Sequence, residues 1–296
     1  MRSLFRVFKA RGVQYLLISG QASVLYGGAF FSQDLDLWIR PTASNISALL
    51  GALRCLRARV HKLTPPLTLR NLRWGHGFHF LVPLRGGPDL YLDLLGQPPR
   101  VGSFGPALGR AERMATPWGV IPVVCIEDLV EIKKTNRPSD YEVITRLAMI
   151  RLGREAAPSP RLLAWALRNA FRVEDLWAMI ERCGRRAVPA GMPAVARALW
   201  RILSAGREPL ERDLLPASRR LAREALRLQE RGRAYWIPRL RELRRMRAEG
   251  LLLPEGAVVG SAAAPEGRYL GSSSPAGWTR SARSGRTPTG HTHREP

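Results

Sequence analysis

Cysteine, lysine and long apolar runs are all scarce in this chain of 296 residues, and each shortage excludes a class of protein. The three cysteines, Cys55, Cys125 and Cys183, lie far apart and form no C-x-x-C pair. Neither a disulfide framework nor a zinc site is therefore indicated. No apolar run reaches about 18 residues, and the N-terminus has no long apolar signal segment. We therefore expect a soluble, cytoplasmic protein without a membrane partner.

Acidic residues are also few. The chain has 24 Asp and Glu against 47 Lys and Arg, which gives a formal net charge of +23, and only four of the basic residues are lysines. Such an excess is typical of proteins that bind nucleic acid or nucleotides. Arg, Ala, Gly and Pro are abundant throughout, and a GC-rich coding sequence explains at least half of this excess, so charge alone does not identify a partner.

The strongest local pattern begins with an apolar run at residues 13–19, which predicts a buried strand. Ser19 and Gly20 then make a turn, and residues 21–26 predict one or two helical turns that a glycine pair ends. A second strand is predicted at residues 30–39. The order is therefore strand, small-residue turn, short helix and strand.

Two carboxylates lie on this second predicted strand. Side chains alternate along a strand, so Asp34 and Asp36 share one face, about 6–7 Å apart. Like charges this close repel each other and raise one pKa, and a bound divalent cation reverses that cost. The pair therefore predicts a metal site, and the turn before it predicts a phosphate. The alternative is that both aspartates lie on the solvated face of an edge strand.

A third carboxylate comes from a predicted hairpin at residues 78–84 and 89–95, which are joined by a glycine-rich turn. A two-cation site needs such a group on a neighbouring strand. Asp93 lies inside the strand and Asp89 lies at the turn, so we favour Asp93. An exposed hairpin face is the alternative. His79 belongs to the same hairpin, and we expect a structural or exposed role for it rather than contact with substrate.

Two predicted helices at residues 127–135 and 139–152 flank a polar segment. The first begins with acidic residues and ends with Lys133 and Lys134, which matches the helix macrodipole. Because the chain has only four lysines, this adjacent pair differs from the arginine background. A phosphate contact and a simple dipole interaction remain equally good explanations.

In order and spacing these features resemble the nucleotidyltransferase superfamily with a DNA polymerase β-like core, and within it the small bacterial branch of abortive-infection, type IV toxins. The resemblance covers residues 10–150. It rests on Ser19-Gly20, Gly27, Asp34-Leu35-Asp36, Asp93 and the run Lys133-Lys134-Thr-Asn-Arg137-Pro-Ser-Asp140. It implies an α+β fold, with a mixed sheet flanked by helices.

The sequence departs from the family pattern in two places. The turn reads Ser-Gly, and its serine still offers a hydrogen-bond donor to a phosphate. Phe30 stands where the family often has an arginine, which removes a phosphate or structural contact.

The resemblance also implies an activity, the transfer of NMP from an NTP such as ATP. Asp34 and Asp36 would bind Mg²⁺, with Asp93 as a further ligand or as the base. Ser19 and Gly20 would bind the nucleotide phosphates, and Lys133 or Lys134 would neutralise their charge. Arg137 and Asp140 would orient that lysine or contact the nucleotide. The acceptor is unknown, with an RNA 3′ end or a protein favoured over a small molecule, and a toxin-like member would have an antitoxin partner. The alternative is a non-catalytic nucleotide- or nucleic-acid-binding protein that retains the fold.

The second half of the chain differs in composition. We divide the chain into a nucleotidyltransferase domain at 1–155, an Arg-rich helical region at 156–250 and a disordered tail at 251–296. Proline and glycine, including Pro216 and Gly232, predict that the helical region consists of short helices. Its arginines suit an RNA acceptor, and a surface helix with internal charge pairs explains them equally well.

Overall fold

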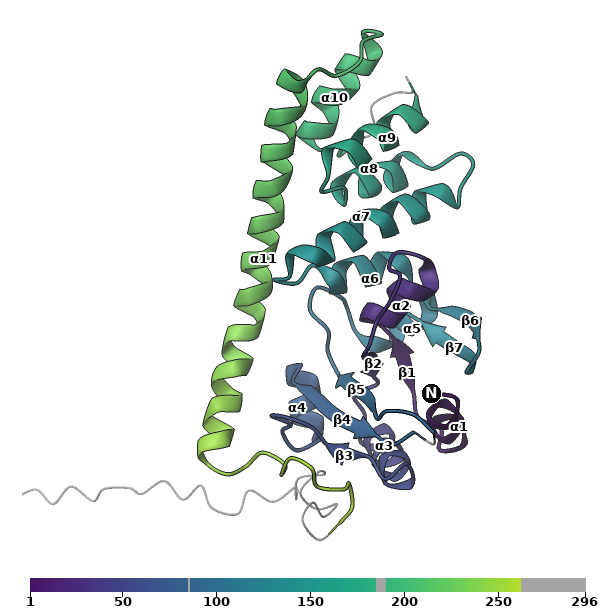
Figure 1. Cartoon of the computed structure of the whole chain (residues 1–296), viewed down its shortest axis with the longest axis vertical. Coiled ribbons are helices and arrows are strands. Elements are labelled where there is room, and N and C mark those ends of the chain that lie inside the picture. Colours follow the sequence, from purple (N-terminus) through teal and green to yellow (C-terminus); the bar gives the residue numbers. More distant parts are fainter. Residues whose placement is uncertain (85, 185–189, 262–296) are drawn as a thin grey trace, which may run out of the picture.

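A computed structural model describes residues 1–84, 86–184 and 190–261 of the chain (Figure 1). These residues form a seven-stranded mixed sheet and eleven helices, which confirms the predicted α+β class. The strands are β1 Tyr15–Leu17, β2 Leu35–Ile39, β3 Arg59–Val60, β4 Gly77–Val82, β5 Leu90–Leu95, β6 Glu112–Thr116 and β7 Gly119–Val123. The helices are α1 Arg2–Ala10, α2 Ser19–Tyr26, α3 Ala43–Cys55, α4 Leu69–Trp74, α5 Phe104–Arg110, α6 Ile126–Lys133, α7 Pro138–Gly153, α8 Pro160–Arg168, α9 Val173–Cys183, α10 Ala194–Ser204 and α11 Glu211–Ala248. No helix among the described residues is long and apolar enough to cross a membrane.

The sheet has the strand order β3-β4-β5-β2-β1-β7-β6. β2 runs parallel to β5 and β1 runs parallel to β7, whereas the other neighbours are antiparallel. Leucines flank Asp36 on β2 and Asp93 on β5, and these flanking leucines, Leu35, Leu37, Leu92 and Leu94, are buried in the core. The register places Asp36 directly beside Asp93. Trp38, predicted as a core residue, is fully buried, and its indole donates to the carbonyl of Gly96.

The second predicted strand is shorter than expected. β2 begins at Leu35, and residues 30–34 form a loop. Pairing with β5 starts at Leu35 opposite Leu92, so the preceding residues have no neighbouring strand to bond with. Phe30 and Phe31 are 93% and 80% exposed in this loop. Asp34 is therefore the last loop residue, and its side chain is free of the alternation that fixes Asp36.

The described residues form two hydrophobic cores. The first surrounds the sheet and includes α7 residues up to Leu147, and the second begins at Ala148 and includes residues of α8 to α11. The division thus falls inside α7. In Figure 1 the helices of the second core stack beyond α6 and α7, and α11 runs along both parts of the molecule.

The prediction of short helices at the end of the helical region is wrong, because α11 is one helix of 38 residues that contains Pro216 and Pro238. Packing explains its continuity. Ala217 and Leu221 of α11 belong to the second core and Leu228 belongs to the first. Gly232 permits close contact rather than ending the helix. A Cβ there would lie 3.1 Å from the carbonyl carbon of Thr135.

The expected start of the disordered tail at residue 251 is also wrong, because residues 251–261 pack against the first core. Leu253 and Val259 are buried. The Val60 amide donates to the Ala257 carbonyl at 2.9 Å, which extends the edge of the sheet beside β3. Residues 262–296, the rest of the expected tail, lie outside the described residues.

Candidate active site

A pocket of about 390 Å³ lies where β2, β5, the start of α2 and the α6–α7 connection meet beneath α11. All nine predicted site residues line it, although up to 121 positions separate them in the sequence. They are Ser19, Gly20, Asp34, Asp36, Asp93, Lys133, Lys134, Arg137 and Asp140. The fold therefore brings these nine residues together in one cavity. In the sequence they were connected only by the resemblance to a known family.

The carboxylates owe their proximity to the sheet. Asp36 and Asp93 lie side by side on parallel neighbouring strands, with their leucine neighbours turned to the core. Asp34 joins them from the loop that precedes β2. Three negative charges thus face one cavity.

The surroundings of Asp36 shift its pKa. Burial, followed by repulsion from Asp93 and from Asp34, raises the pKa of Asp36 to about 6. A hydrogen bond from Ser19 and the positive charge of Lys133 oppose that rise. The protein alone thus compensates the carboxylates incompletely at neutral pH, and an added cation would favour the ionised form of Asp36.

The donor set has the chemistry that Mg²⁺ prefers, because all three groups are hard carboxylate oxygens. In the part of the chain that the structure describes, however, no group of three or more His, Cys, Asp or Glu side chains is arranged to hold a metal ion. Oδ1 of Asp93 is hydrogen-bonded to Nδ1 of His79 at 2.7 Å. Mg²⁺ is commonly bound by one or two carboxylates together with substrate phosphates, so a cage made by the protein alone is not required.

The turn after β1 fixes the loop that carries Asp34. Ser19 has φ 58°, and a Cβ on Gly20 would lie 2.1 Å from Oγ of Ser32. Only glycine fits this approach, and Gln21 adds a hydrogen bond from its side chain to the Ser32 carbonyl at 2.7 Å. The Ser32 hydroxyl in turn donates to the carbonyl of Asp34. The predicted phosphate turn therefore also positions a predicted metal ligand.

The α6–α7 connection contains a buried ion pair. Nζ of Lys133 lies 2.8 Å from Oδ1 of Asp140, and Thr135 donates its hydroxyl to the other oxygen of Asp140. Lys134 pairs with Glu131 one turn earlier. Both lysines thus have an acidic partner. Arg137 is exposed and has no acidic partner among the described residues, which leaves its full charge at the pocket.

Sequence reasoning did not place two components in the site. His79 lies directly opposite Asp93 in the antiparallel β4–β5 register, so the predicted hairpin contained the signal for this contact. The other component is a wall provided by α11, for which no motif gave a signal. It consists of Gly232, Trp236, Arg239, Leu240 and Leu243.

Two contacts hold α11 against the sheet beside this wall. Nε2 of the fully buried His76 lies 3.0 Å from Oε2 of Glu242. Burial lowers the pKa of His76, and Glu242 opposes this change. The guanidinium of Arg239 lies over the rings of Tyr235 and Trp74, at 3.5 and 5.4 Å from their centroids. The second half of the chain therefore completes the pocket.

Comparison of the chain with protein-family models and with curated protein sequences found no match.

Proposed function

We propose that this protein is a nucleotidyltransferase with a polymerase β-like core, which moves NMP from an NTP to an acceptor hydroxyl. The observation that carries the proposal is the adjacency of Asp36 and Asp93 on parallel strands, in a pocket that also contains Asp34 and the Ser19-Gly20 turn. Assignment to the toxin branch, with an antitoxin as partner, is part of the proposal through the sequence resemblance alone.

In the proposed reaction the acceptor oxygen attacks the α-phosphorus of the NTP. The bond from that phosphorus to the β-phosphate oxygen breaks, and pyrophosphate leaves with the electron pair. We assign the proton of the acceptor hydroxyl to Asp93, whose carboxylate is oriented by His79. Asp34, Asp36 and Asp93 would hold Mg²⁺, which when bound neutralises phosphate charge and the repulsion among the carboxylates.

The remaining site residues bind and orient the nucleotide in this proposal. Ser19 and Gly20 begin α2, where backbone N–H groups favour a phosphate. Arg137 supplies a positive charge that no carboxylate among the described residues neutralises. Lys133 is held by Asp140, which supports the role of Asp140 as a group that orients the lysine.

A second candidate is a binding protein that keeps the fold without catalysis. It is favoured by the hydrogen bond that occupies one oxygen of Asp93 and by the ion pairs of both lysines, because a substrate would have to compete with each of them. Phe30, in place of the arginine common in the family, points the same way.

Transfer of label from each of the four NTPs separates these candidates. The protein is incubated with Mg²⁺ and, in turn, RNA, protein and small alcohols. We expect Asp36→Asn to reduce transfer by about 100-fold or more. Asp89→Asn is the matched control, because Asp89 lies on the same hairpin and pairs with Arg59.

Unchanged transfer by both Asp36→Asn and Asp34→Asn would contradict the mechanism. Nucleotide binding without transfer to any acceptor would favour the binding protein.

A further inference from the structure

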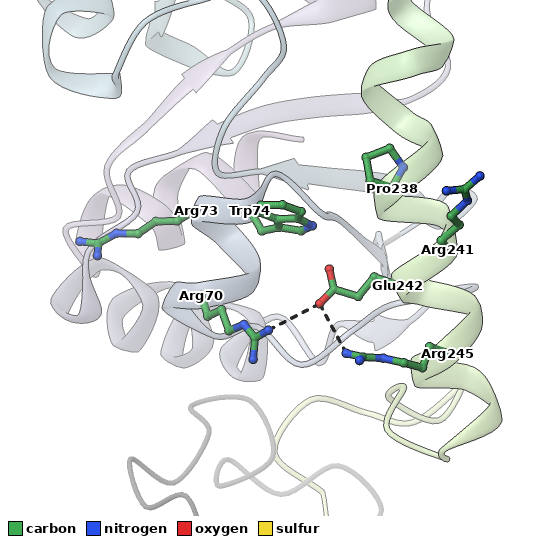
Figure 2. A pocket seen from close by; sticks show the side chains of 7 residues that line it. All are labelled: Arg70, Arg73, Trp74, Pro238, Arg241, Glu242 and Arg245. Atoms are coloured by element: carbon green, nitrogen blue, oxygen red, sulfur yellow. Dashed lines mark ion pairs between the residues drawn. The ribbon is translucent and has the colours of Figure 1, made fainter. Parts of the chain in front are cut away.

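A second, more open cavity of about 760 Å³ lies between α4 and α11 (Figure 2). We call it the α4–α11 groove. It is lined by Arg70, Arg73, Trp74, Arg241, Glu242 and Arg245, with Pro238 at its edge. Figure 2 shows that α4 provides one side and α11 the other, with Glu242 reaching across toward Arg70.

The groove is strongly positive. Four arginines line it with one carboxylate, Glu242, which is only 16% exposed and already contacts His76, Arg70 and Arg245. The contacts to Arg70 and Arg245 are long, 3.9 and 4.0 Å. Among the described residues, Arg73 and Arg241 have no acidic partner. Figure 2 shows the side chains of Arg73 and Arg241 extending away from the space between the two helices, so their charge is available to a polyanion at the two rims of the groove.

An exposed aromatic ring lies among these charges. Trp74 ends α4 and is 48% exposed, which is unusual for a large apolar side chain flanked by arginines. The Arg239 guanidinium lies over this ring. A flat aromatic face between cationic side chains is the arrangement that binds single-stranded nucleic acid, because bases stack on the ring and arginines contact phosphates. An acidic peptide would use the charges and not the ring.

The groove adjoins the proposed active site. Trp74 lines the groove and His76, two residues later, lines the catalytic pocket. On α11, Glu242 lines the groove, and Arg239 and Leu243 line the pocket. The segment 74–76 and one turn of α11 therefore separate the two cavities, so that a strand bound in the groove has the catalytic pocket as its nearest neighbour.

We propose that the α4–α11 groove binds a single-stranded polynucleotide, and that this strand is the acceptor of the nucleotide. The second part rests on the proposed function, and the first part does not. Phosphates contact the four arginines, a base stacks on Trp74, and the end of the strand reaches the pocket that contains the carboxylates. The hydroxyl oxygen at that end forms the new bond to the α-phosphorus as pyrophosphate leaves.

Binding is measured without NTP, by fluorescence anisotropy of labelled single-stranded 12-mers of RNA and of DNA, over a range of salt concentrations. We expect the full chain with Arg73→Glu and Arg241→Glu to bind at least 10-fold more weakly. The slope of log affinity against log salt should also fall by about 1.4, because two phosphate contacts are lost. The matched control is Arg219→Glu with Arg223→Glu, which makes the same charge change on α11 at about 27–33 Å from Arg241 along the helix.

Trp74 gives a second readout that does not depend on charge. We expect Trp74→Ala to weaken binding about 10-fold and Trp74→Phe to restore most of it, with the salt slope unchanged. Should the glutamate variants fail to fold, Arg73→Gln with Arg241→Gln tests the same contacts. Equal loss in the Arg219 and Arg223 control, or equal binding of poly-glutamate and oligonucleotides, would overturn the proposal.

The two proposals fail in different ways. If the strand binds in the groove, Asp36→Asn does not weaken binding, because it removes a negative charge near the end of the strand, and it reduces transfer. Groove binding without transfer refutes the proposed function. Transfer to another acceptor, with no groove-dependent binding of any oligonucleotide, refutes the groove and leaves the proposed function in place. A preference for the RNA or the DNA 12-mer identifies the strand.

Discussion

The sheet region and the helical region of this molecule contribute to the same pocket in different ways. In the sheet region, Asp36 and Asp93 lie on strands that are paired on both sides, and the other polar site residues lie on the loops and helix ends beside these strands. The helical region contributes through α11 alone. Only a few side chains of α11 contact the rest of the pocket, and their partners lie far away in the sequence. The first region therefore determines which groups act, and the second determines the shape of the cavity around them.

The two regions also differ in how their charge is used. In the sheet region, buried Lys133 and Asp140 form an ion pair, whereas Asp36, Asp34 and Asp93 repel one another. Apart from the contacts of Glu242 with His76 and Arg70, the ion pairs of α11 lie within the helix, such as Arg245 with Glu249 at 3.9 Å, and exposed pairs of this kind contribute little to stability. An excess of arginine that adds little to folding is free to serve binding.

The largest expected effect concerns whether the two cores unfold as one. Leu176 is fully buried in the second core. We expect Leu176→Ala to lower the free energy of unfolding by about 2–5 kcal/mol. Because α11 contacts both cores, calorimetry should still show one transition, shifted to lower temperature. A separate early transition, with the sheet region unchanged, would show that α11 does not couple them.

A smaller effect tests the packing inside the sheet region. Gly20→Ala places a Cβ against Ser32 and displaces the loop that carries Asp34. We expect transfer, in the assay of the proposed function, to fall by about 10- to 100-fold, because small displacements of reacting groups are costly. Gly20→Ala combined with Ser32→Gly removes both the Oγ and the Cβ contact and should restore much of the activity. If Ser32→Gly does not restore activity, the loss in Gly20→Ala has a cause other than contact with Ser32.

The smallest effect concerns the raised pKa of Asp36. The folded protein holds a proton on Asp36 up to about pH 6, whereas an unfolded chain releases it near the ordinary value of 3.8. The stability of the metal-free protein should therefore fall as pH rises from about 4 to about 6, and remain lower above that. We expect Asp36→Asn to raise the free energy of unfolding at pH 8 by about 1–3 kcal/mol and to leave it nearly unchanged at pH 4.

Denaturant titrations at pH 4 and pH 8 measure this difference, with Asp89→Asn as the control that should gain nothing. Added Mg²⁺ should stabilise the parent protein at pH 8 and not at pH 4, since the cation binds the ionised carboxylate. If the difference in free energy of unfolding between Asp36→Asn and the parent protein were the same at pH 4 and pH 8, the assignment of the raised pKa to Asp36 would be contradicted.

Patterns within about ten residues predicted the sheet region well. Alternation placed Asp36 and Asp93 on strands, and in the structure Asp93 lies beside Asp36 whereas Asp89 pairs with Arg59 at the edge of the sheet. The predicted strand at residues 30–34 was wrong, because a strand also needs a neighbouring strand to pair with. The sequence does not show where pairing begins.

The contribution of α11 to the pocket could not be predicted, because it also depends on contacts between residues far apart in the sequence. Pro216 and Gly232 are helix breakers by local propensity, and only packing against two cores keeps the helix continuous. The contact of Glu242 with His76 joins residues 166 positions apart. Neither residue belongs to a local pattern that indicates the other.

A truncated chain without α11 would lack part of the pocket, because this helix runs along both parts of the molecule (Figure 1). A fragment that ends at residue 155 would keep every predicted metal and phosphate ligand, yet it would lose the wall of the cavity. It would also lose Glu242, the partner of Nε2 of His76, whose Nδ1 already has no hydrogen-bond partner. The sheet region and the helical region are therefore not interchangeable modules. Exchange of the region after residue 210 for that of another protein would change what the cavity accepts while every carboxylate stayed in place.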